Sequence, residues 1–369
     1  MKKLLLIAVL AVALVTDPFY YLLGPALDPV NYPAQISFPE KFFWGVSSAA
    51  HQTEGHQTND WTVWEKNNAQ RLANNYRDCS KNQGIFCAEK TDPANYISGS
   101  AADHYQQYQE DISLAKQLKL NAYRFSLEWS RIEPKPGEFD QAVIDHYRQE
   151  IRQAREAGME PFVNIWHWTN PLWFTEQGGW CQNQSIDQFN RYAKKVIEEY
   201  GNEVNYWITL NEPQVYVTMP YVDRRPPGIN PLCSYQILNN LTVAHKQTYQ
   251  AIKTNWPSSQ VGITTGSLFF ESSVSDTLSR AQQGSARFWN SYLLKQINGY
   301  QDFIGLNYFH GGLTYGYKKN SDYVSDIGWP LYPEGLYYIL KDLGQFDKPI
   351  IITENGLAPL LEEVMQLKK

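Results

Sequence analysis

Clusters of positive charge are missing from this sequence of 369 residues, and its charge balance is acidic. The 32 Lys and Arg residues stand against 38 Asp and Glu residues, which leaves a formal net charge of −6. A protein that binds the phosphate backbone of a nucleic acid needs gathered positive charge. We therefore exclude nucleic acid as a partner.

Cysteine is scarce, and the four that occur (Cys79, Cys87, Cys181 and Cys233) do not have metal-site spacing with a nearby His. We therefore expect no metal, because zinc sites use closely spaced Cys and His ligands. Cys79 and Cys87 flank a short polar stretch, and a local disulfide between them is plausible in an oxidising compartment. Four unpaired thiols are the alternative.

A long apolar run that would span a bilayer comfortably is also missing. Met1-Lys2-Lys3 precedes the uncharged run Leu4–Val15, which has the form of a signal peptide and is short for a membrane span. If the run continues through Phe19–Leu23, residues 4–23 could act as an uncleaved membrane anchor. We expect residues 1–23 to be a signal peptide or anchor, and the protein to be exported (secreted or periplasmic) or membrane-anchored.

Nucleotide-binding motifs of the GxGxxG or P-loop type and low-complexity linkers do not occur either. What recurs is a short β-rich run followed by a helical pattern, which fits repeated βαβ units around a parallel sheet. The pattern predicts one α/β domain, a (β/α)8 TIM barrel over residues 37–369. The predicted strands are 42–49, 121–129, 160–168, 204–213, 260–266, 302–309 and 349–356.

Three amphipathic helices can be placed between these strands. Apolar side chains repeat at spacings of three and four over 103–118. Ser185 can cap a helix that runs on to Tyr200, and a third helix runs from about Tyr235 to Trp256, where Pro257 stops it.

Polar side chains lie at the tips of the predicted strands, where the active sites of (β/α) barrels gather. Taken singly, each has an ordinary explanation as a turn or packing residue. Their convergence at several strand tips favours a functional site. The candidates are Gln52, Arg124, His167, Trp168, Asn211, Glu212, Asn307, Tyr308 and Glu354.

Two of these candidates are glutamates, Glu212 at the end of the fourth strand and Glu354 at the end of the seventh. In a barrel we expect them to face one another across its mouth. Acetal hydrolysis needs one carboxyl group to protonate the leaving oxygen and one carboxylate to meet the oxocarbenium-like carbon. Arg124 would keep the second carboxyl ionised, because a nearby positive charge lowers a carboxyl pKa.

At these motifs the sequence resembles glycoside hydrolase family 1, the β-glucosidase group, over about residues 37–358. TLNEP (209–213) and ITENG (352–356) are similar to the family's acid/base and nucleophile motifs, and the other motifs follow in the family's order. They are FFWGVSSAAHQTEG (42–55), DHYQQYQEDISLAKQL (103–118), YRFSLEWSRIEP (123–134), PFVNIWHWTNP (161–171), GGW (178–180), PPG (226–228), DFIGLNY (302–308) and GWPLYPEGLY (328–337).

The resemblance implies a role for each matching residue. Glu212 would be the acid/base and Glu354 the nucleophile of a retaining double displacement, with Arg124 beside the nucleophile. Acid, nucleophile and water suffice for this reaction, so we expect no metal and no organic cofactor. The implied contacts to the glycone, the sugar that is cleaved off, are Gln52, His167, Trp168 and Asn211, with Asn211 at the sugar 2-hydroxyl.

Two departures from the family pattern affect the second half of the chain. The family usually has Asn-Tyr-Tyr after the sixth strand, where this chain has Asn307-Tyr308-Phe309. Either Tyr308 donates to the nucleophile in place of the second Tyr, or that donor is missing. The stretch between strands five and six is also shorter than in the family, which implies a trimmed loop on the aglycone side.

The end of the chain is the larger departure, because only fifteen residues follow Glu354. A further strand with its crossover needs roughly 30 residues. We therefore expect a barrel that lacks the eighth strand, its closing helices and the family's glycone-binding Trp and Glu.

These observations predict a retaining β-glycosidase of the β-glucosidase type that acts on a β-linked glycoside or oligosaccharide. One alternative is a non-catalytic protein that binds glycans or a partner through the open barrel. Another is a related barrel glycosidase that cuts β-glucans or β-mannans, but QTEG (52–55) and HWTNP (167–171) favour the β-glucosidase group.

Overall fold

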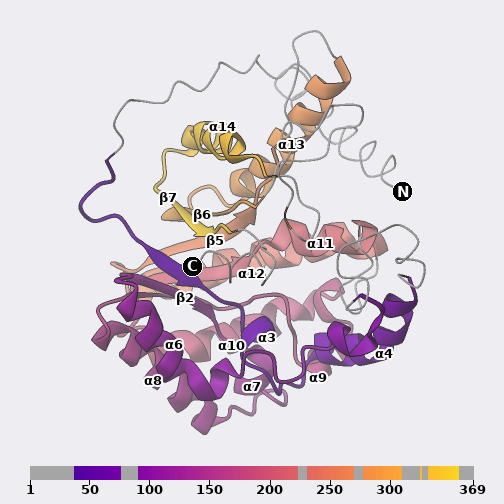
Figure 1. Cartoon of the computed structure of the whole chain (residues 1–369), viewed down its shortest axis with the longest axis vertical. Coiled ribbons are helices and arrows are strands. Elements are labelled where there is room, and N and C mark those ends of the chain that lie inside the picture. The colour runs from indigo at the N-terminus through magenta and orange to yellow at the C-terminus, as the bar shows by residue number, and fades with distance from the viewer. Residues whose placement is uncertain are drawn as a thin grey trace, which may run out of the picture. The chain divides into compact units, whose positions relative to one another are not determined.

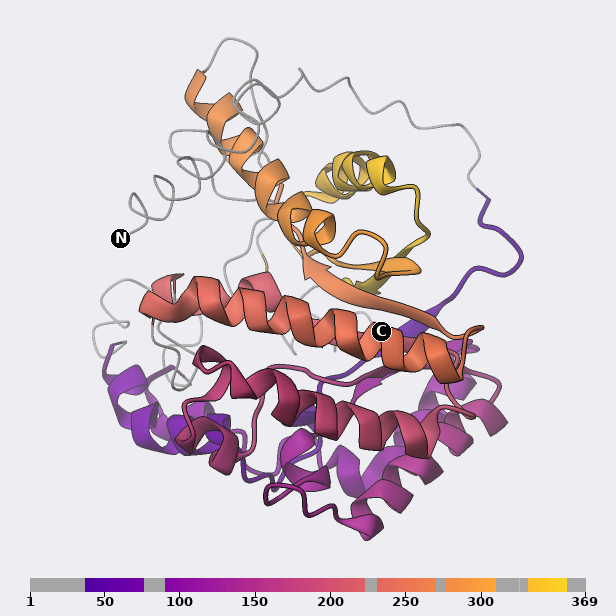
Figure 2. The same cartoon turned by 180° about the vertical axis from the view of Figure 1, so that it is seen from behind.

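A computed structural model describes residues 37–75, 90–222, 231–269, 277–309, 325 and 331–356 of the chain. It divides into two compact units, one of residues 41–263 and one that includes residues 264–356, with the boundary inside strand β5 (Gln260–Gly266). Figure 1 labels the α-helices and several of the strands, and Figure 2 shows the same structure from behind. Each unit is described by itself below.

The unit of residues 41–263 contains the first four strands, which are β1 (Gly45–Ser47), β2 (Ala122–Ser126), β3 (Glu160–Asn164) and β4 (Tyr206–Asn211). Neighbouring strands pair in parallel, and Arg124 of β2 lies opposite Phe162 of β3. Every residue of β2 is buried, as are all but the first residues of β3 and β4. Strands β2 to β4 therefore form the inside of this unit, whereas the three residues of β1 are exposed.

Helices surround these strands. The α-helices with eight residues or more are α4 (Asp60–Asn74), α6 (His104–Gln117), α8 (Gln141–Glu156), α10 (Gln184–Tyr200), α11 (Pro213–Val222) and α12 (Ser234–Asn255). The shorter helical segments are α3 (Ala50–Thr53), η2 (Pro93–Tyr96), α7 (Trp129–Ile132), α9 (Leu172–Glu176), η3 (Gly179–Cys181) and η4 (Pro231–Cys233). Helices α6 and α8 pack side by side, as do α10 and α12 (Figure 1).

Local sequence explains where several of these helices begin. Asn59 caps α4 through a reciprocal pair of hydrogen bonds with Thr62, and the Asp140 carboxylate accepts from two backbone N–H groups of α8. The inner faces are aromatic as well as aliphatic: Trp129 stacks on Tyr192 with ring centroids 5.1 Å apart. The core of this unit is consequently rich in large rings.

The second unit begins within β5 and continues with α13 (Thr277–Gln296), β6 (Phe303–Asn307), α14 (Pro333–Leu343), η5 (Gly344–Phe346) and β7 (Ile350–Glu354). Strand β6 is fully buried and pairs in parallel with β7. The side chain of Ile352 in β7 is 40% exposed. Strand β7 is therefore much less covered than β6.

The seven strands follow one another in sequence order in a single sheet, β1 to β7, as in a (β/α) barrel. All seven predicted strands are present, and β5 has the predicted bounds, whereas the others are shorter than predicted. No eighth strand occurs among the described residues. The expected α/β class with seven strands is confirmed.

The helix predictions are confirmed apart from one cap. The predicted helices at 103–118 and 235–256 correspond to α6 and α12. The prediction for Ser185 was wrong, because α10 begins at Gln184 with Asn183 as its N-cap, and Ser185 is buried inside the first turn.

Two predictions fall on residues that lie outside the described ranges: the signal peptide or anchor at 1–23 and the Cys79–Cys87 disulfide. Among the helices that the structure does describe, none combines the length and the apolar character needed to cross a membrane.

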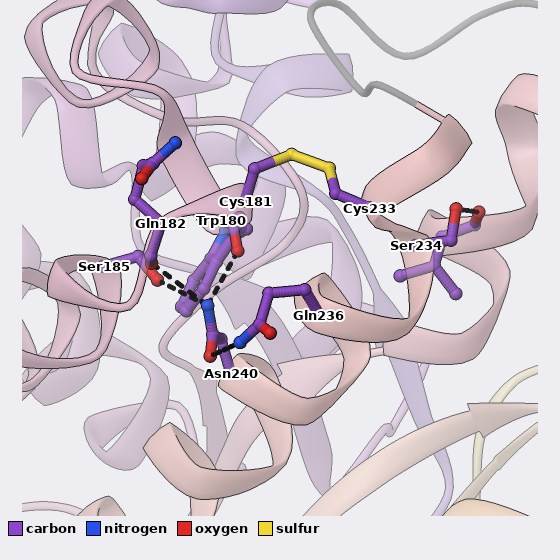
Figure 3. The surroundings of a disulfide bond; sticks show 9 residues. Trp180, Cys181, Gln182, Ser185, Cys233, Ser234, Gln236 and Asn240 are labelled. Carbon is purple, nitrogen blue, oxygen red and sulfur yellow. Dashed lines mark hydrogen bonds between the residues drawn. A yellow bond between two sulfur atoms is a disulfide. The ribbon is translucent and has the colours of Figure 1, made fainter.

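A disulfide that was not predicted joins Cys181 at the end of η3 to Cys233 at the end of η4 (Figure 3). Beside it, the Asn240 amide donates to the backbone carbonyls of Trp180 at 2.9 Å and Gln182 at 3.0 Å. Asn240 is completely buried. The bond and the amide together tie the start of α12 to the segment that leads into α10.

Candidate active site

Arg124 and Asn211 form the centre of the site in the unit of residues 41–263. Arg124 lies in the middle of β2 and is 4% exposed, and Asn211 is the last residue of β4. The guanidinium donates one hydrogen bond of 2.6 Å to Oδ1 of Asn211 and another of 2.6 Å to the Ser47 hydroxyl. Because Asn211 receives this bond on Oδ1, its amide nitrogen is turned the other way.

His167 lies on that other side of Asn211. Its Nε2 is 2.9 Å from the Asn211 amide nitrogen, and its Nδ1 is 3.2 Å from the side-chain amide of Asn164, the last residue of β3. Burial, followed by the charges of Arg124 and His51, lowers the pKa of His167 well below its ordinary value of 6.5. The ring is therefore neutral at physiological pH.

Two site residues have backbone angles that side chains rarely adopt. Trp168 has φ of 79° and Glu212 has φ of 45°, both in the left-handed region. The indole N–H of Trp168 donates to the Asn211 carbonyl at 2.8 Å, which holds the ring beside the end of β4. Such strained residues cluster at functional sites, because the surrounding structure must hold them in place.

Glu212 follows β4 directly and precedes Pro213, the first residue of α11. As a whole residue, Glu212 is half-buried. Gln52 lies in α3 of the same unit and is exposed, and its contact with a ligand stays a prediction.

An aromatic cluster lies next to Trp168. The Trp61 ring centroid is 6.1 Å from that of Trp168 and 5.6 Å from that of His51. Burial alone would lower the pKa of His51, but its hydrogen bond to Glu65 and the charge of that carboxylate raise it. Aromatic faces next to a polar site are suited to the apolar faces of sugar rings.

In the second unit, the ends of β6 and β7 bring Asn307 and Glu354 together. The strand register shifts there, so that Leu306 lies opposite Ile352 but Asn307 lies opposite Glu354, and Thr353 is the extra residue. Such bulges re-aim side chains near active sites. The Thr353 hydroxyl donates to Oδ1 of Asn307 at 2.8 Å, which ties the two strand ends together.

Tyr308 lies next to this pair but is turned toward α14. Its hydroxyl donates to the Tyr332 carbonyl at 2.5 Å, and its ring is buried against Gly335. Its backbone N–H donates to the Glu354 carbonyl at 3.0 Å. Phe309, where the family usually has a second Tyr, carries no hydroxyl group. The hydroxyl of Tyr308 thus serves the packing of α14.

The structure therefore brings the predicted residues together in two groups. The unit of residues 41–263 contains Gln52, Arg124, His167, Trp168, Asn211 and Glu212. The second unit contains Asn307, Tyr308 and Glu354. The facing of Glu212 and Glu354 stays a prediction. The sequence interpretation missed Asn164 and Trp61. Asn164 was hidden because the third strand was predicted to run to Trp168, whereas β3 ends at Asn164. A predicted strand end at Asn164 would have made this residue a candidate, like the other polar residues at strand tips.

Comparisons with known proteins agree with this arrangement. The profile of glycosyl hydrolase family 1 matches residues 34–297. β-Glucosidase A of Thermotoga maritima is 29% identical over 372 residues, which cover 87% of this chain and 78% of that protein.

Solved structures show the same likeness. A β-glycosidase from Pyrococcus horikoshii superposes with a TM-score of 0.73 at 29% identity, covering 89% of this chain and 78% of that one. The β-glucosidase from Thermotoga maritima in complex with deoxynojirimycin gives 0.71 at 27% identity, with 87% and 78% covered.

The strand order, the polar strand ends and these relatives define a glycoside hydrolase of the β-glucosidase type on an α/β-barrel fold. Within that class, the match over residues 34–297 shows that the chain belongs to glycosyl hydrolase family 1.

Proposed function

We propose that this chain hydrolyses terminal β-glucosides with retention of configuration. Glu212 acts as the general acid and then the general base, and Glu354 acts as the nucleophile that forms a glycosyl-enzyme intermediate. The observation that carries the proposal is that each glutamate directly ends or follows a barrel strand, beside an asparagine that a side chain from another strand holds. No metal and no organic cofactor enters the reaction.

In the first step, the Glu212 carboxyl group gives its proton to the glycosidic oxygen while Glu354 bonds to the anomeric carbon, and the aglycone leaves. In the second step, Glu212 takes a proton from water, and this water displaces Glu354. Retaining enzymes of this kind hold their two carboxyl groups about 5 Å apart. The Asn211 amide, fixed by Arg124, supports the proposal as a contact for a sugar hydroxyl next to the reacting carbon.

The experiment is hydrolysis of an aryl β-glucoside by the purified full chain, beside Glu354→Ala and Glu212→Ala. We expect Glu354→Ala to abolish turnover. Glu212→Ala should lose roughly 10²–10⁴-fold on an alkyl glucoside, whose leaving group needs a proton. It should lose much less in the first step on a dinitrophenyl glucoside, whose leaving group needs none.

The stereochemistry is read by proton NMR of the first sugar released, which should have the β configuration. Inversion would overturn the double displacement. An equal loss of rate in Glu212→Ala on the alkyl and the dinitrophenyl glucoside would overturn the role of Glu212 as acid. A folded chain that binds glucose analogues without hydrolysing any β-glucoside would instead favour the glycan-binding alternative.

We also propose that the protein is exported. The Cys181–Cys233 disulfide supports this, because disulfides persist mainly in oxidising compartments outside the cytosol. The uncharged run Leu4–Val15 after two lysines supports it as well. Fractionation of the source cells tests the proposal, and recovery of the chain with reduced Cys181 and Cys233 in the cytosolic fraction would contradict it.

A further inference from the structure

Asn164 is a completely buried polar residue that the proposed mechanism does not use. Its side-chain amide lies 3.2 Å from Nδ1 of His167. Its Oδ1 is buried and makes no hydrogen bond among the described residues. An amide oxygen in a protein interior destabilises the fold when no donor meets it. This orphaned oxygen indicates that the amide and the imidazole pair in another way.

The hydrogen bonds around His167 determine which atom of the Asn164 amide faces the imidazole. Arg124 can only donate, so Asn211 must turn Oδ1 toward it and its NH₂ group toward Nε2 of His167. Nε2 must then accept. A neutral imidazole has one acceptor and one donor, so Nδ1 must carry the proton. That proton needs an acceptor, and the orphaned Oδ1 of Asn164 supplies it once the amide is turned over.

We propose that Asn164 is a positioning residue, whose Oδ1 accepts from Nδ1–H of His167 and thereby keeps Nε2 as the acceptor that orients Asn211. The result is a chain of hydrogen bonds, from Arg124 to Asn211 on one side and from Asn211 through His167 to Asn164 on the other. This inference rests on the proposed function, since Asn211 is the proposed contact of the sugar.

This series of hydrogen bonds explains why an amide and not a carboxylate lies at position 164. A carboxylate beside Nδ1 would favour the imidazolium form, and a proton on Nε2 would then face the NH₂ group of Asn211. Two donors would oppose each other, and Asn211 would lose its orientation. Within residues 41–263, the charged or titratable groups that act on His167 are Arg124 from β2 and His51 from α3, and both disfavour its protonation.

The same unit contains the opposite arrangement in His104, the first residue of α6. Its Nδ1 lies 2.6 Å from a carboxylate oxygen of Asp111, and its Nε2 lies 3.2 Å from one of Glu150. Burial would lower the pKa of His104, but Glu150 and then Asp111 raise it to about 9. His104 is therefore an internal reference for an imidazolium in the same protein.

The test reads the proton positions directly, by two-bond proton–nitrogen NMR on the full chain labelled with ¹⁵N-histidine. The chain has seven His, and the two signals needed are assigned by their loss in His167→Gln and His104→Gln. We expect the neutral Nδ1–H tautomer at His167 and the imidazolium pattern at His104 at neutral pH. A proton on Nε2 of His167 would overturn the proposal.

Two variants then separate positioning from packing. Asn164→Asp keeps an acceptor for Nδ1–H but attracts a proton to the pair, whereas Asn164→Leu has a similar volume and no acceptor. For Asn164→Asp we expect kcat/KM on an aryl β-glucoside to fall about tenfold or more at low pH. In this variant the new carboxylate should raise the pKa of His167, and kcat/KM should recover as the pH rises through that value. Asn164→Leu should remain low at every pH.

Parallel pH profiles for the two variants would show a packing role only and would overturn the proposal. Failure of the proposed function is distinguishable from failure of this inference, because the tautomer is read without substrate. If only the proposed function fails, Glu354→Ala would retain hydrolysis, while the His167 signal would keep the Nδ1–H pattern.

Discussion

Two histidines in the same compact unit, His167 and His104, have opposite surroundings. His104 lies between α6, α8 and β2, where Glu150 accepts hydrogen bonds from both the imidazole and the Tyr123 hydroxyl. With Asp111 at Nδ1, each ring nitrogen of His104 has a carboxylate neighbour, and the Tyr123 hydroxyl also lies 2.8 Å from Nε2. The pKa of His104 is raised to about 9, although burial works in the opposite direction. His104 is therefore charged at neutral pH.

At the strand ends, both hydrogen-bonding neighbours of His167 are amides, and the charge that lowers its pKa most is the positive Arg124. Burial and charge act together there, and both lower its pKa. The comparison teaches that burial alone does not decide the state of a histidine, because the partners at the two ring nitrogens can reverse its effect. The cluster around His104 stabilises the fold through an imidazolium cation. The cluster around His167 keeps a neutral ring that orients Asn211.

The largest effect on this comparison is expected from removing Arg124, the cation that lowers the pKa of His167. Arg124→Gln should lower kcat/KM at least about 100-fold, since Asn211 loses the bond that orients it. Loss of the charged donor to Asn211 and Ser47 should also destabilise the fold by about 1–3 kcal/mol, because it leaves their oxygen atoms without this hydrogen bond. The measurements are aryl β-glucoside kinetics and urea unfolding.

Arg124→Lys is the matched control, because it retains the charge without the two-pronged geometry. It should keep the pKa of His167 low but recover little activity, whereas Arg124→Gln should let that pKa rise. An unchanged pKa of His167 in folded Arg124→Gln would show that the positive charge does not act on the ring.

The second prediction concerns the charged histidine. The pKa of His104 is about 9 in the folded chain, above its ordinary 6.5, so the folded state binds the proton more tightly. Its contribution to stability is fully present below about pH 6.5 and disappears as pH rises through about 9. The change is on the order of 3 kcal/mol.

Urea unfolding from pH 6 to about pH 10 measures this loss, with His104→Gln as the comparison. The variant should start less stable and lack this part of the alkaline decline. If both proteins lose stability equally between these pH values, His104 is not the group that titrates.

The third prediction extends the comparison to the second unit, where Tyr308 is held by packing and not by charge. A Cβ at Gly335 would lie 2.1 Å from the Tyr308 hydroxyl oxygen and 3.1 Å from the Phe269 ring. Gly335→Ala should therefore destabilise by about 1–3 kcal/mol, because a packed interior resists added volume. Thermal unfolding measures the change.

Gly344, directly after α14, is the matched control for this substitution. A Cβ there meets nothing within 4 Å, and the backbone has φ of −55°, which any residue adopts. Gly344→Ala should be neutral or slightly stabilising. Equal losses in both variants would mean that the contact with Tyr308 is not responsible.

The smallest effect is expected for an ion pair in solvent. Lys135 lies 3.0 Å from Glu138, and their side chains are 70% and 67% exposed. Lys135→Ala should change stability by no more than about 0.5 kcal/mol, and less in high salt. A loss as large as that from removing His104 would show that burial does not distinguish these electrostatic contacts.

Much of the fold and part of the site could be predicted from the sequence. Strand positions followed from short β-rich runs, and Glu212 and Glu354 were found because a carboxylate at the end of an apolar strand is unusual. Asn164 was missed, since an Asn inside a run read as continuous strand has no local signature. Its role depends on His167, Asn211 and Arg124, which come from three different segments.

The Cys181–Cys233 disulfide was missed for the same reason, because the two residues are 52 apart in sequence and only the packing of η3 against α12 brings them together. The sequence by itself determined the class of fold, the family and the chemistry of the strand ends, since these depend on local periodicity and on motifs that are contiguous in the chain. The tertiary structure alone decided which groups are neutral and which are charged. His104 and His167 have the same side chain, and only the partners that folding places at each ring nitrogen make one a cation and the other a neutral acceptor.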